Sequence, residues 1–173
     1  MQDRKKRIVF VGYMFSGKST VGRKLAAKLG YKFIDTDWEI EEKFHYTIYN
    51  IFERFGEEIF RKMEKDMLRN ILERDNVVIA TGGGLPCCFD NMQQIKEKAF
   101  SIYLKADVNQ IISRQKQSKL KRPLLKNKSE EEIREYIQKS LQEREQYYMQ
   151  ADIIVPSLNA DVNQILALIE ENI

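Results

Sequence analysis

A glycine-containing loop near the start of the chain constrains the fold more than any other sequence feature. Residues 12–19 read GYMFSGKS and match the spacing G-x-x-x-x-G-K-[ST]. The loop follows an apolar run at residues 8–11, and residues 18–29 after it carry apolar side chains at helical spacing. A buried strand, a glycine loop and a helix in this order are typical of a phosphate-binding loop. The segment therefore predicts a nucleoside triphosphate site in an α/β protein.

The residue types in this loop suit phosphate chemistry. Glycines let the backbone curl so that N–H groups point toward phosphate oxygens, and the following helix adds the positive end of its dipole. Lys18 can reach the β- and γ-phosphates of ATP, and the Ser19 hydroxyl can ligate Mg²⁺. The predicted nucleotide contacts in this segment are Phe15, Ser16, Gly17, Lys18, Ser19 and Thr20. The motif alone does not define the reaction, because kinases, motor ATPases and GTPases share it.

Apolar runs of strand length alternate with amphipathic stretches along the rest of the chain. The expected strands are residues 8–11, 32–35, 77–81, 100–104 and 152–155. The expected helices are residues 18–29, 39–44, 48–55, 57–72, 90–98, 108–116, 129–148 and 161–169. Such alternation implies right-handed crossovers and a parallel sheet covered on both faces. The chain is therefore predicted to form a single domain, residues 1–173, with a three-layer α/β/α P-loop kinase fold.

Composition argues against several classes of protein. With 29 Lys and Arg against 26 Asp and Glu, the net charge of +3 is too balanced for a nucleic-acid binder. The basic residues 4–7 are interpreted as a solvated lead-in to the first strand, and the apolar run after them is too short for a membrane span or a secretory signal. The two cysteines, Cys87 and Cys88, are adjacent, which argues against a disulfide and indicates a reducing cytoplasm. The only histidine, His45, has no evident partner, so histidine chemistry is not expected.

Two further segments place polar groups where expected strands end. Asp35 and Asp37 close the second strand, and alternation along a strand would point both carboxylates the same way, one toward Mg²⁺ and one toward a substrate hydroxyl. One of them could instead cap the following helix. Three glycines, Gly82, Gly83 and Gly84, follow the third strand, where they could present backbone N–H groups to a ligand. A plain flexible turn is the alternative for these glycines.

Taken in order, the motifs resemble those of the shikimate kinase family over nearly the whole chain. They are residues 12–19, Asp35-Thr36-Asp37, Ile51-Phe52, Gly56-Glu57, Phe60-Arg61, Glu64, Gly82-Gly83-Gly84, Arg122-Pro123-Leu124-Leu125, Arg144 and Tyr147-Tyr148. The segment at residues 52–64 and the run at residues 122–125 separate that family from gluconate kinases and adenylate-type kinases. The resemblance implies ATP-dependent phosphorylation of the 3-hydroxyl of shikimate, giving shikimate 3-phosphate and ADP, a step of chorismate and aromatic amino acid biosynthesis.

The resemblance also implies how the substrate is held. Arg61 and Arg144 would bind its carboxylate, since planar guanidinium groups hold carboxylates through two parallel hydrogen bonds. Asp37 would hold the substrate hydroxyls beside the attacking oxygen, and residues 82–84 would contact the same ring. From the residues alone, a solvated helix face or a pair with Ser140 is the favoured interpretation of Arg144.

The nucleotide side is assigned in the same way. Ser19 would ligate Mg²⁺, with Asp35 in the outer shell of the ion. The basic segment at residues 116–128 resembles a mobile lid, from which Arg122 would reach the ATP phosphates, while Arg114 would flank the adenine. The residues implied to act in catalysis are Asp37, Lys18 and Arg122.

Two departures from the family pattern stand out. The family's loop often has glycine where this chain has Phe15. Some relatives carry an arginine near the last strand that packs on adenine, whereas residues 157–160 here contain none. The family resemblance also suggests a monomer. Two other functions remain open at this stage: a gluconate-type sugar-acid kinase, and a nucleotide-binding regulatory module that has lost catalysis.

Overall fold

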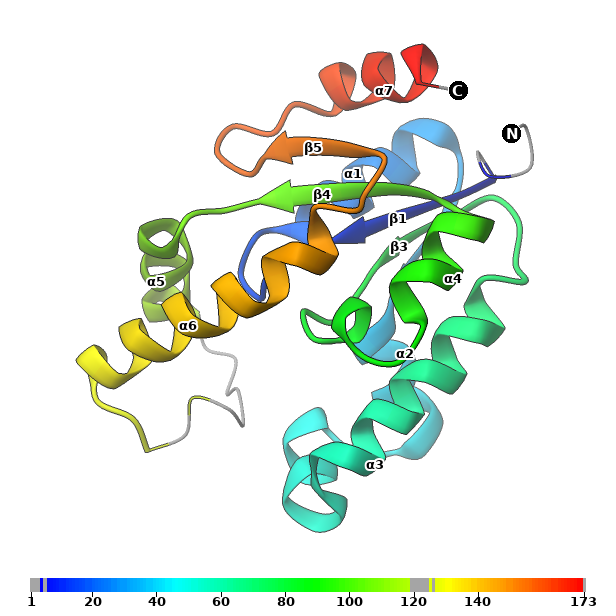
Figure 1. Ribbon diagram of the computed structural model, residues 1–173. Coiled ribbons are helices and arrows are strands. Elements are labelled where there is room, and N and C mark those ends of the chain that lie inside the picture. The colour runs from blue at the N-terminus through cyan, green and yellow to red at the C-terminus, as the bar shows by residue number, and fades with distance from the viewer. Residues whose placement is uncertain (1–3, 5, 119–124, 126, 173) are drawn as a thin grey trace.

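The fold is built around one parallel sheet, shown in Figure 1, in a computed structural model that describes residues 4, 6–118, 125 and 127–172. The strand order is β2-β3-β1-β4-β5, and every neighbouring pair is parallel. The strands are β1 (Arg7–Val11), β2 (Lys32–Asp35), β3 (Val77–Ala80), β4 (Phe100–Lys105) and β5 (Ile153–Pro156). The strand that leads into the glycine loop, β1, is therefore the central one, and the loop leaves the sheet at its middle.

Helices cover both faces of this sheet (Figure 1). They are α1 (Lys18–Leu29), α2 (Thr36–Phe44), α3 (Ile48–Ile71), α4 (Asn91–Lys98), α5 (Val108–Gln117), α6 (Glu130–Tyr148) and α7 (Val162–Glu171), with a short 3-10 helix, η2 (Leu85–Cys87). Alternate residues of β1 enter two separate hydrophobic clusters. Ile8 and Phe10 join the cluster under α1 and α7, whereas Val9 and Val11 join the cluster under α2 to α6. The predicted three-layer α/β/α arrangement is confirmed.

The junction between β2 and α2 differs from the prediction. The strand ends at Asp35 and α2 begins at Thr36, earlier than the predicted helix start at residue 39. The cause is a cap: the Asp35 carboxylate accepts a hydrogen bond from the backbone N–H of Asp37 at 3.0 Å. The predicted strand at residues 32–35 is confirmed, but the alternation expected to align Asp35 with Asp37 does not apply, because Asp37 belongs to the first turn of the helix.

The predicted break between residues 55 and 57 is present as a kink within α3. Gly56 has φ 79° and ψ 171°, which are not helical values, and the helix continues on both sides of it. A backbone at positive φ suits glycine because it has no Cβ to clash with the chain. The kink separates a short first segment of α3 from a second segment that begins at Glu57.

The basic amino-terminal residues are less solvated than expected. Arg4 donates hydrogen bonds to the carbonyl of Ala99 and to the carboxylate of Asp152, where the closest distance is 2.8 Å. Arg7 donates to the carbonyl of Arg74 and pairs with Asp75 at 2.7 Å. The interpretation of these two arginines as a solvated lead-in is therefore wrong, since both tie the start of β1 to neighbouring segments.

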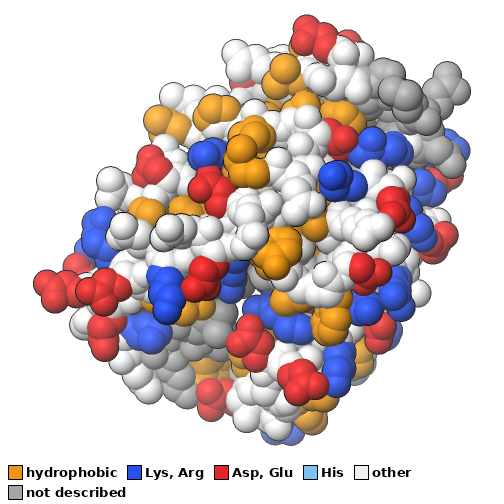
Figure 2. Space-filling model, viewed as in Figure 1, with side chains coloured by type: hydrophobic (Ala, Val, Ile, Leu, Met, Phe, Trp, Pro, Cys, Tyr) orange, Lys and Arg blue, Asp and Glu red, His pale blue; other side chains and the backbone are white. Residues whose placement is uncertain are grey.

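Acidic and basic side chains intermingle over the face shown in Figure 2, which is hollowed between the side carrying α5 and α6 and the lobe formed by α2 and α3. Basic side chains lie at the edge of this hollow. In the described part of the chain, none of the helices has the length and apolar character required to cross a bilayer.

Candidate active site

The glycine loop curls at the end of the central strand in a shape that requires glycine. Gly12 has φ 142°, and a Cβ placed there would lie 2.7 Å from the carbonyl oxygen of Leu104. Gly17 has φ 97° and is the N-cap of α1. A side chain at Gly12 would collide with backbone, so the loop reaches its position against β4 only with glycine.

A cavity opens over this loop and the start of α1. Its lining residues are Met14, Phe15, Gly17, Lys18, Ser19, Thr20, Asp35, Asp37, Thr81, Gly82 and Gly83. Five of the six predicted nucleotide contacts in the loop are brought together here, while the sixth, Ser16, is buried, with its hydroxyl 3.4 Å from the Lys18 amino group. The Lys18 ammonium also donates to the carbonyls of Gly12 and Tyr13 at 2.8 and 2.7 Å. It must turn away from these carbonyls to reach a phosphate.

Phe15 occupies the loop in a conformation that is unusual for a bulky residue. Its φ of 62° lies in the left-handed region, which costs an L-residue about 1–2 kcal/mol. A glycine at this position would adopt the same conformation without that cost. Arg114 donates to the carbonyls of Phe15 and Ser16 at 3.1 and 2.8 Å, and it also lies 3.4 Å from the hydroxyl of Ser157. Arg114 thus braces the outer side of the loop, a contact that the sequence did not predict.

Two oxygen groups suited to a divalent cation meet beside Lys18. The Ser19 hydroxyl donates to the Asp35 carboxylate at 2.6 Å. A hydroxyl and a carboxylate are hard oxygen ligands, and Mg²⁺ in kinases takes one or two such protein groups together with phosphate oxygens and water. The residues present therefore fit the predicted Mg²⁺ site, although Asp35 also caps α2.

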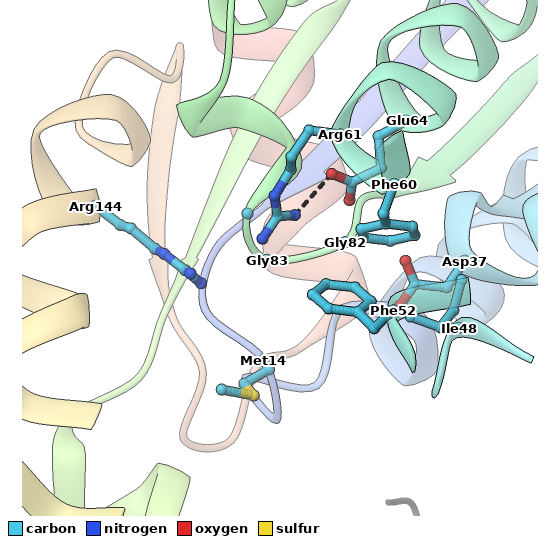
Figure 3. A pocket seen from close by; sticks show the side chains of 11 residues that line it. Met14, Asp37, Ile48, Phe52, Phe60, Arg61, Glu64, Gly82, Gly83 and Arg144 are labelled. Atoms are coloured by element: carbon cyan, nitrogen blue, oxygen red, sulfur yellow. Dashed lines mark hydrogen bonds and ion pairs between the residues drawn. The ribbon is translucent and has the colours of Figure 1, made fainter. Parts of the chain in front are cut away.

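A second cavity adjoins the first and contains the predicted substrate residues (Figure 3). Its lining residues are Met14, Asp37, Ile48, Phe52, Phe60, Arg61, Glu64, Gly82, Gly83, Gly84 and Arg144. Figure 3 shows Arg61 and Arg144 reaching toward the same space from α3 and α6, with Asp37 across it. Among the described residues, four line both cavities, and Asp37 is the one with a charged side chain.

Arg61 is held by two carboxylates of its own helix. Its guanidinium lies 2.7 Å from Glu57 and 2.7 Å from Glu64. Spacings of three and four residues bring these side chains together on one face of the second segment of α3. Sequence reasoning gave neither glutamate a role, although this helical spacing was the available signal.

Burial and charge perturb Glu64 strongly. Burial raises the pKa of the Glu64 carboxyl to about 7, Arg61 opposes that rise, and the charge of Asp37 adds to it. Burial alone would lower the pKa of Arg61, but its carboxylate partners raise it instead. Glu64 can therefore change its charge near neutral pH.

This raised pKa predicts how stability depends on pH. Between pH 4.5 and about 7 the folded chain holds a proton on Glu64 that the unfolded chain releases, so the free energy of unfolding falls as pH rises through this window. The full effect of Glu64 is about 3 kcal/mol. In Glu64→Gln this contribution is absent, and urea unfolding between pH 5 and 8 should show a weaker fall. Glu58→Gln, on the exposed side of the same helix, is the matched control, and equal slopes in all three proteins would contradict the prediction.

Arg144 points inward rather than to solvent. Its guanidinium lies over the ring of Tyr13, 5.5 Å from the centroid, and it reaches the second cavity. Ser140, its alternative partner, instead hydrogen-bonds the Tyr13 hydroxyl and donates to the carbonyl of Tyr136 at 2.7 Å. Both alternatives for Arg144, a solvated helix face and a pair with Ser140, are therefore wrong.

The predicted lid at residues 116–128 lies only partly within the described residues. Arg122 lies outside them. Of the flanking residues, Lys116 pairs with Glu130 at 2.7 Å, and Leu125 packs into the hydrophobic cluster on the α2-to-α6 side of the sheet.

Comparison with known proteins identifies the family. Residues 14–173 match the family model for shikimate kinase. A shikimate kinase of Parabacteroides distasonis is 44% identical over 148 residues, which are 86% of each chain. A crystal structure of shikimate kinase from Bacteroides thetaiotaomicron matches with a TM-score of 0.90 and 37% identity, covering 95% of this chain and 98% of that one. Shikimate kinase from Acinetobacter baumannii in complex with shikimate matches with a TM-score of 0.87 and 34% identity, covering 98% and 96%. The chain therefore belongs to the shikimate kinase family, whose members transfer a phosphate group to shikimate.

Proposed function

We propose that this chain transfers the γ-phosphoryl group of ATP to the 3-hydroxyl of shikimate, across the boundary between its two cavities. The observation that carries the proposal is that Asp37 lines both the phosphate-loop cavity and the cavity containing Arg61 and Arg144. A phosphoryl group can pass directly between neighbouring cavities only where they meet, and the charged residue at that place is a carboxylate suited to orient a hydroxyl.

On the substrate side, two arginines converge on one space. Arg61 comes from α3 and Arg144 from α6, and a small ring acid placed between them would direct its carboxylate to both guanidinium groups. The rings of Phe52 and Phe60 pack against each other at a tilt of 47°, with centroids 4.8 Å apart, and give this cavity an apolar wall for the carbon ring. These features favour shikimate over an open-chain acid such as gluconate. The match to the shikimate kinase family likewise does not favour gluconate.

On the nucleotide side, we assign the phosphates to the loop amides, the amino end of α1 and Lys18. Ser19 would hold Mg²⁺ directly and Asp35 would hold it through water, and the bound ion supplies charge neutralisation on the transferring phosphoryl group. Arg122 and the lid at residues 116–128 keep their predicted role of delivering positive charge to the phosphates. Arg114 keeps its predicted place beside the adenine, next to the loop that it braces.

Catalysis in this scheme is mostly positioning. Phosphoryl transfer passes through a loose transition state in which little charge moves onto the attacking oxygen until late. Asp37 orients the 3-hydroxyl and takes its proton as the new bond forms. The amino end of α2 stabilises the negative charge of Asp37, because that residue lies in the first turn of the helix. Loss of catalysis in a regulatory module is not favoured, since Lys18, Ser19, Asp35 and Asp37 are all present at the first cavity.

We propose that the whole chain acts as one catalytic domain, as a monomer, in a reducing cytoplasm. The two thiols, Cys87 and Cys88, are both free, which suits that compartment.

A coupled assay of ADP release tests the function. We expect magnesium- and shikimate-dependent release of ADP, with shikimate 3-phosphate as the second product, and no turnover with gluconate at the same concentration. Turnover with gluconate but not shikimate would replace the proposed acceptor. ATP binding without turnover of either acid would favour the regulatory module.

A further inference from the structure

One face of α6 carries more than the arginine already described. Ser140, Arg144 and Tyr148 are spaced by four residues, so they lie on one side of the helix. Each contacts a loop of the site: Ser140 hydrogen-bonds the Tyr13 hydroxyl, Arg144 lies over the Tyr13 ring, and the Tyr148 hydroxyl donates to the carbonyl of Gly83 at 2.5 Å. We call these three residues the α6 stripe.

The two loops that the stripe contacts also touch each other. A Cβ placed on Gly83 would lie 3.0 Å from the backbone nitrogen of Met14, in the phosphate loop. Gly83 is therefore packed directly on that loop. On its other side the glycine segment is fixed by the N–H of Gly82, which donates to the Thr36 hydroxyl at 2.9 Å. The segment at residues 82–84 is thus held between α2, the phosphate loop and Tyr148.

The hydroxyl of Tyr148 and that of Tyr13, the partner of Ser140, are in a position to act as fixed anchors. Tyr148 is fully buried and Tyr13 nearly so. Burial raises the pKa of Tyr148 well above its usual value and that of Tyr13 to about 12, so both phenols keep their protons at physiological pH. A polar group that is left poorly paired is costly, and removal of the Tyr148 hydroxyl would leave the half-buried carbonyl of Gly83 to the thiol of Cys87, a weak donor at 3.9 Å.

We propose that the α6 stripe sets the positions of both loops, with Tyr148 as a positioning residue for the substrate and Ser140 as one for the nucleotide. Tyr148 fixes the Gly83 carbonyl and so the plane of the peptide that ends in the N–H of Gly84, a residue of the substrate cavity. One helical turn earlier, Arg144 grips the carboxylate of the same substrate. A single helix therefore sets the distance between two contacts on one small molecule. This inference rests on the substrate site proposed above.

Tyr148→Phe tests the substrate half, because it keeps the ring and removes only the hydroxyl. We expect the KM for shikimate to rise by about tenfold, as for loss of one buried hydrogen bond, with a clearly smaller change in the KM for ATP. The matched control is Tyr103→Phe. The Tyr103 ring packs on Tyr148 with centroids 5.2 Å apart, but its hydroxyl donates to Glu145, at 3.5 Å, and not to the carbonyl of Gly83. Tyr103→Phe should leave both KM values unchanged.

Ser140→Ala tests the nucleotide half and should give the reverse pattern, a KM for ATP that rises more than the KM for shikimate, which can change slightly because Arg144 packs on the Tyr13 ring. Two results would overturn the proposal and reduce Tyr148 to a packing role. One is an unchanged shikimate KM in Tyr148→Phe. The other is an equal change in both KM values that the control Tyr103→Phe also shows. If Tyr148→Phe does not fold, as judged by thermal melting, an unchanged ATP KM in Ser140→Ala overturns it instead. Failure of the proposed function has a different signature, since the unmodified enzyme would then not phosphorylate shikimate.

Discussion

Replacement of Asp37 by asparagine is expected to lower kcat by about 10² to 10⁴, the usual value of a positioned acid–base group. Asparagine keeps the shape of the side chain but loses the charge that orients the attacking hydroxyl and receives its proton. Asp37 is the charged residue common to the two cavities, so its loss should affect the chemical step more than the binding of either ligand. In the variant the backbone N–H of residue 37 can still donate to the Asp35 carboxylate, so the cap at the start of α2 is preserved.

Steady-state kinetics and binding of a non-hydrolysable ATP analogue check this expectation. The analogue should bind Asp37→Asn as it binds the parent, while turnover collapses. Glu42→Gln is the matched control, because it removes a carboxylate from an exposed position on the same helix. Turnover of Asp37→Asn close to that of Glu42→Gln would show that a charge at residue 37 is not needed for transfer.

The fold could be predicted from sequence because most of its strands are short, largely apolar runs. The run at residues 8–11 is buried on both faces, as a central parallel strand must be, and a glycine follows it. The kink at Gly56 was also visible, since glycine interrupts a helical pattern there. These features are local, so periodicity and glycine placement were sufficient to find them.

The contacts that complete the site were not local and could not be predicted in the same way. Arg114 contacts the phosphate loop from 98 residues along the chain, and Tyr148 contacts Gly83 from 65 residues away. Which carbonyl each side chain reaches depends on how the helices pack on the sheet. The periodicity of the sequence carries no information on this packing. Asp35 illustrates a different difficulty. The sequence offers a helix cap and a metal ligand as alternative roles for this carboxylate. In the structure one of its oxygens caps α2 and the other accepts a hydrogen bond from the Ser19 hydroxyl, so the two roles are compatible.

The position of the Arg61 guanidinium depends on the absence of a side chain at Gly84. A Cβ placed on Gly84 would lie 2.6 Å from Cζ and Nη2 of Arg61, well inside van der Waals contact. Gly84 itself has φ −87° and ψ −16°, values that alanine adopts without strain. Gly84→Ala should therefore fold normally and act by pushing the guanidinium out of its place between Glu57 and Glu64.

We expect Gly84→Ala to raise the KM for shikimate by about 10- to 100-fold with little change in the KM for ATP, since misplacement of a positioning group by about 1 Å can cost about 10²-fold. A double-mutant cycle with Arg61→Lys separates displacement of Arg61 from other effects. Arg61→Lys alone should also raise the KM for shikimate, because lysine cannot make two parallel hydrogen bonds to a carboxylate. If Gly84→Ala acts through Arg61, adding it to Arg61→Lys should produce little further loss, since the shorter, flexible lysine can move aside from the new methyl group. Fully additive losses would mean that the methyl group blocks the substrate directly, and the position of Arg61 would not be what Gly84 protects.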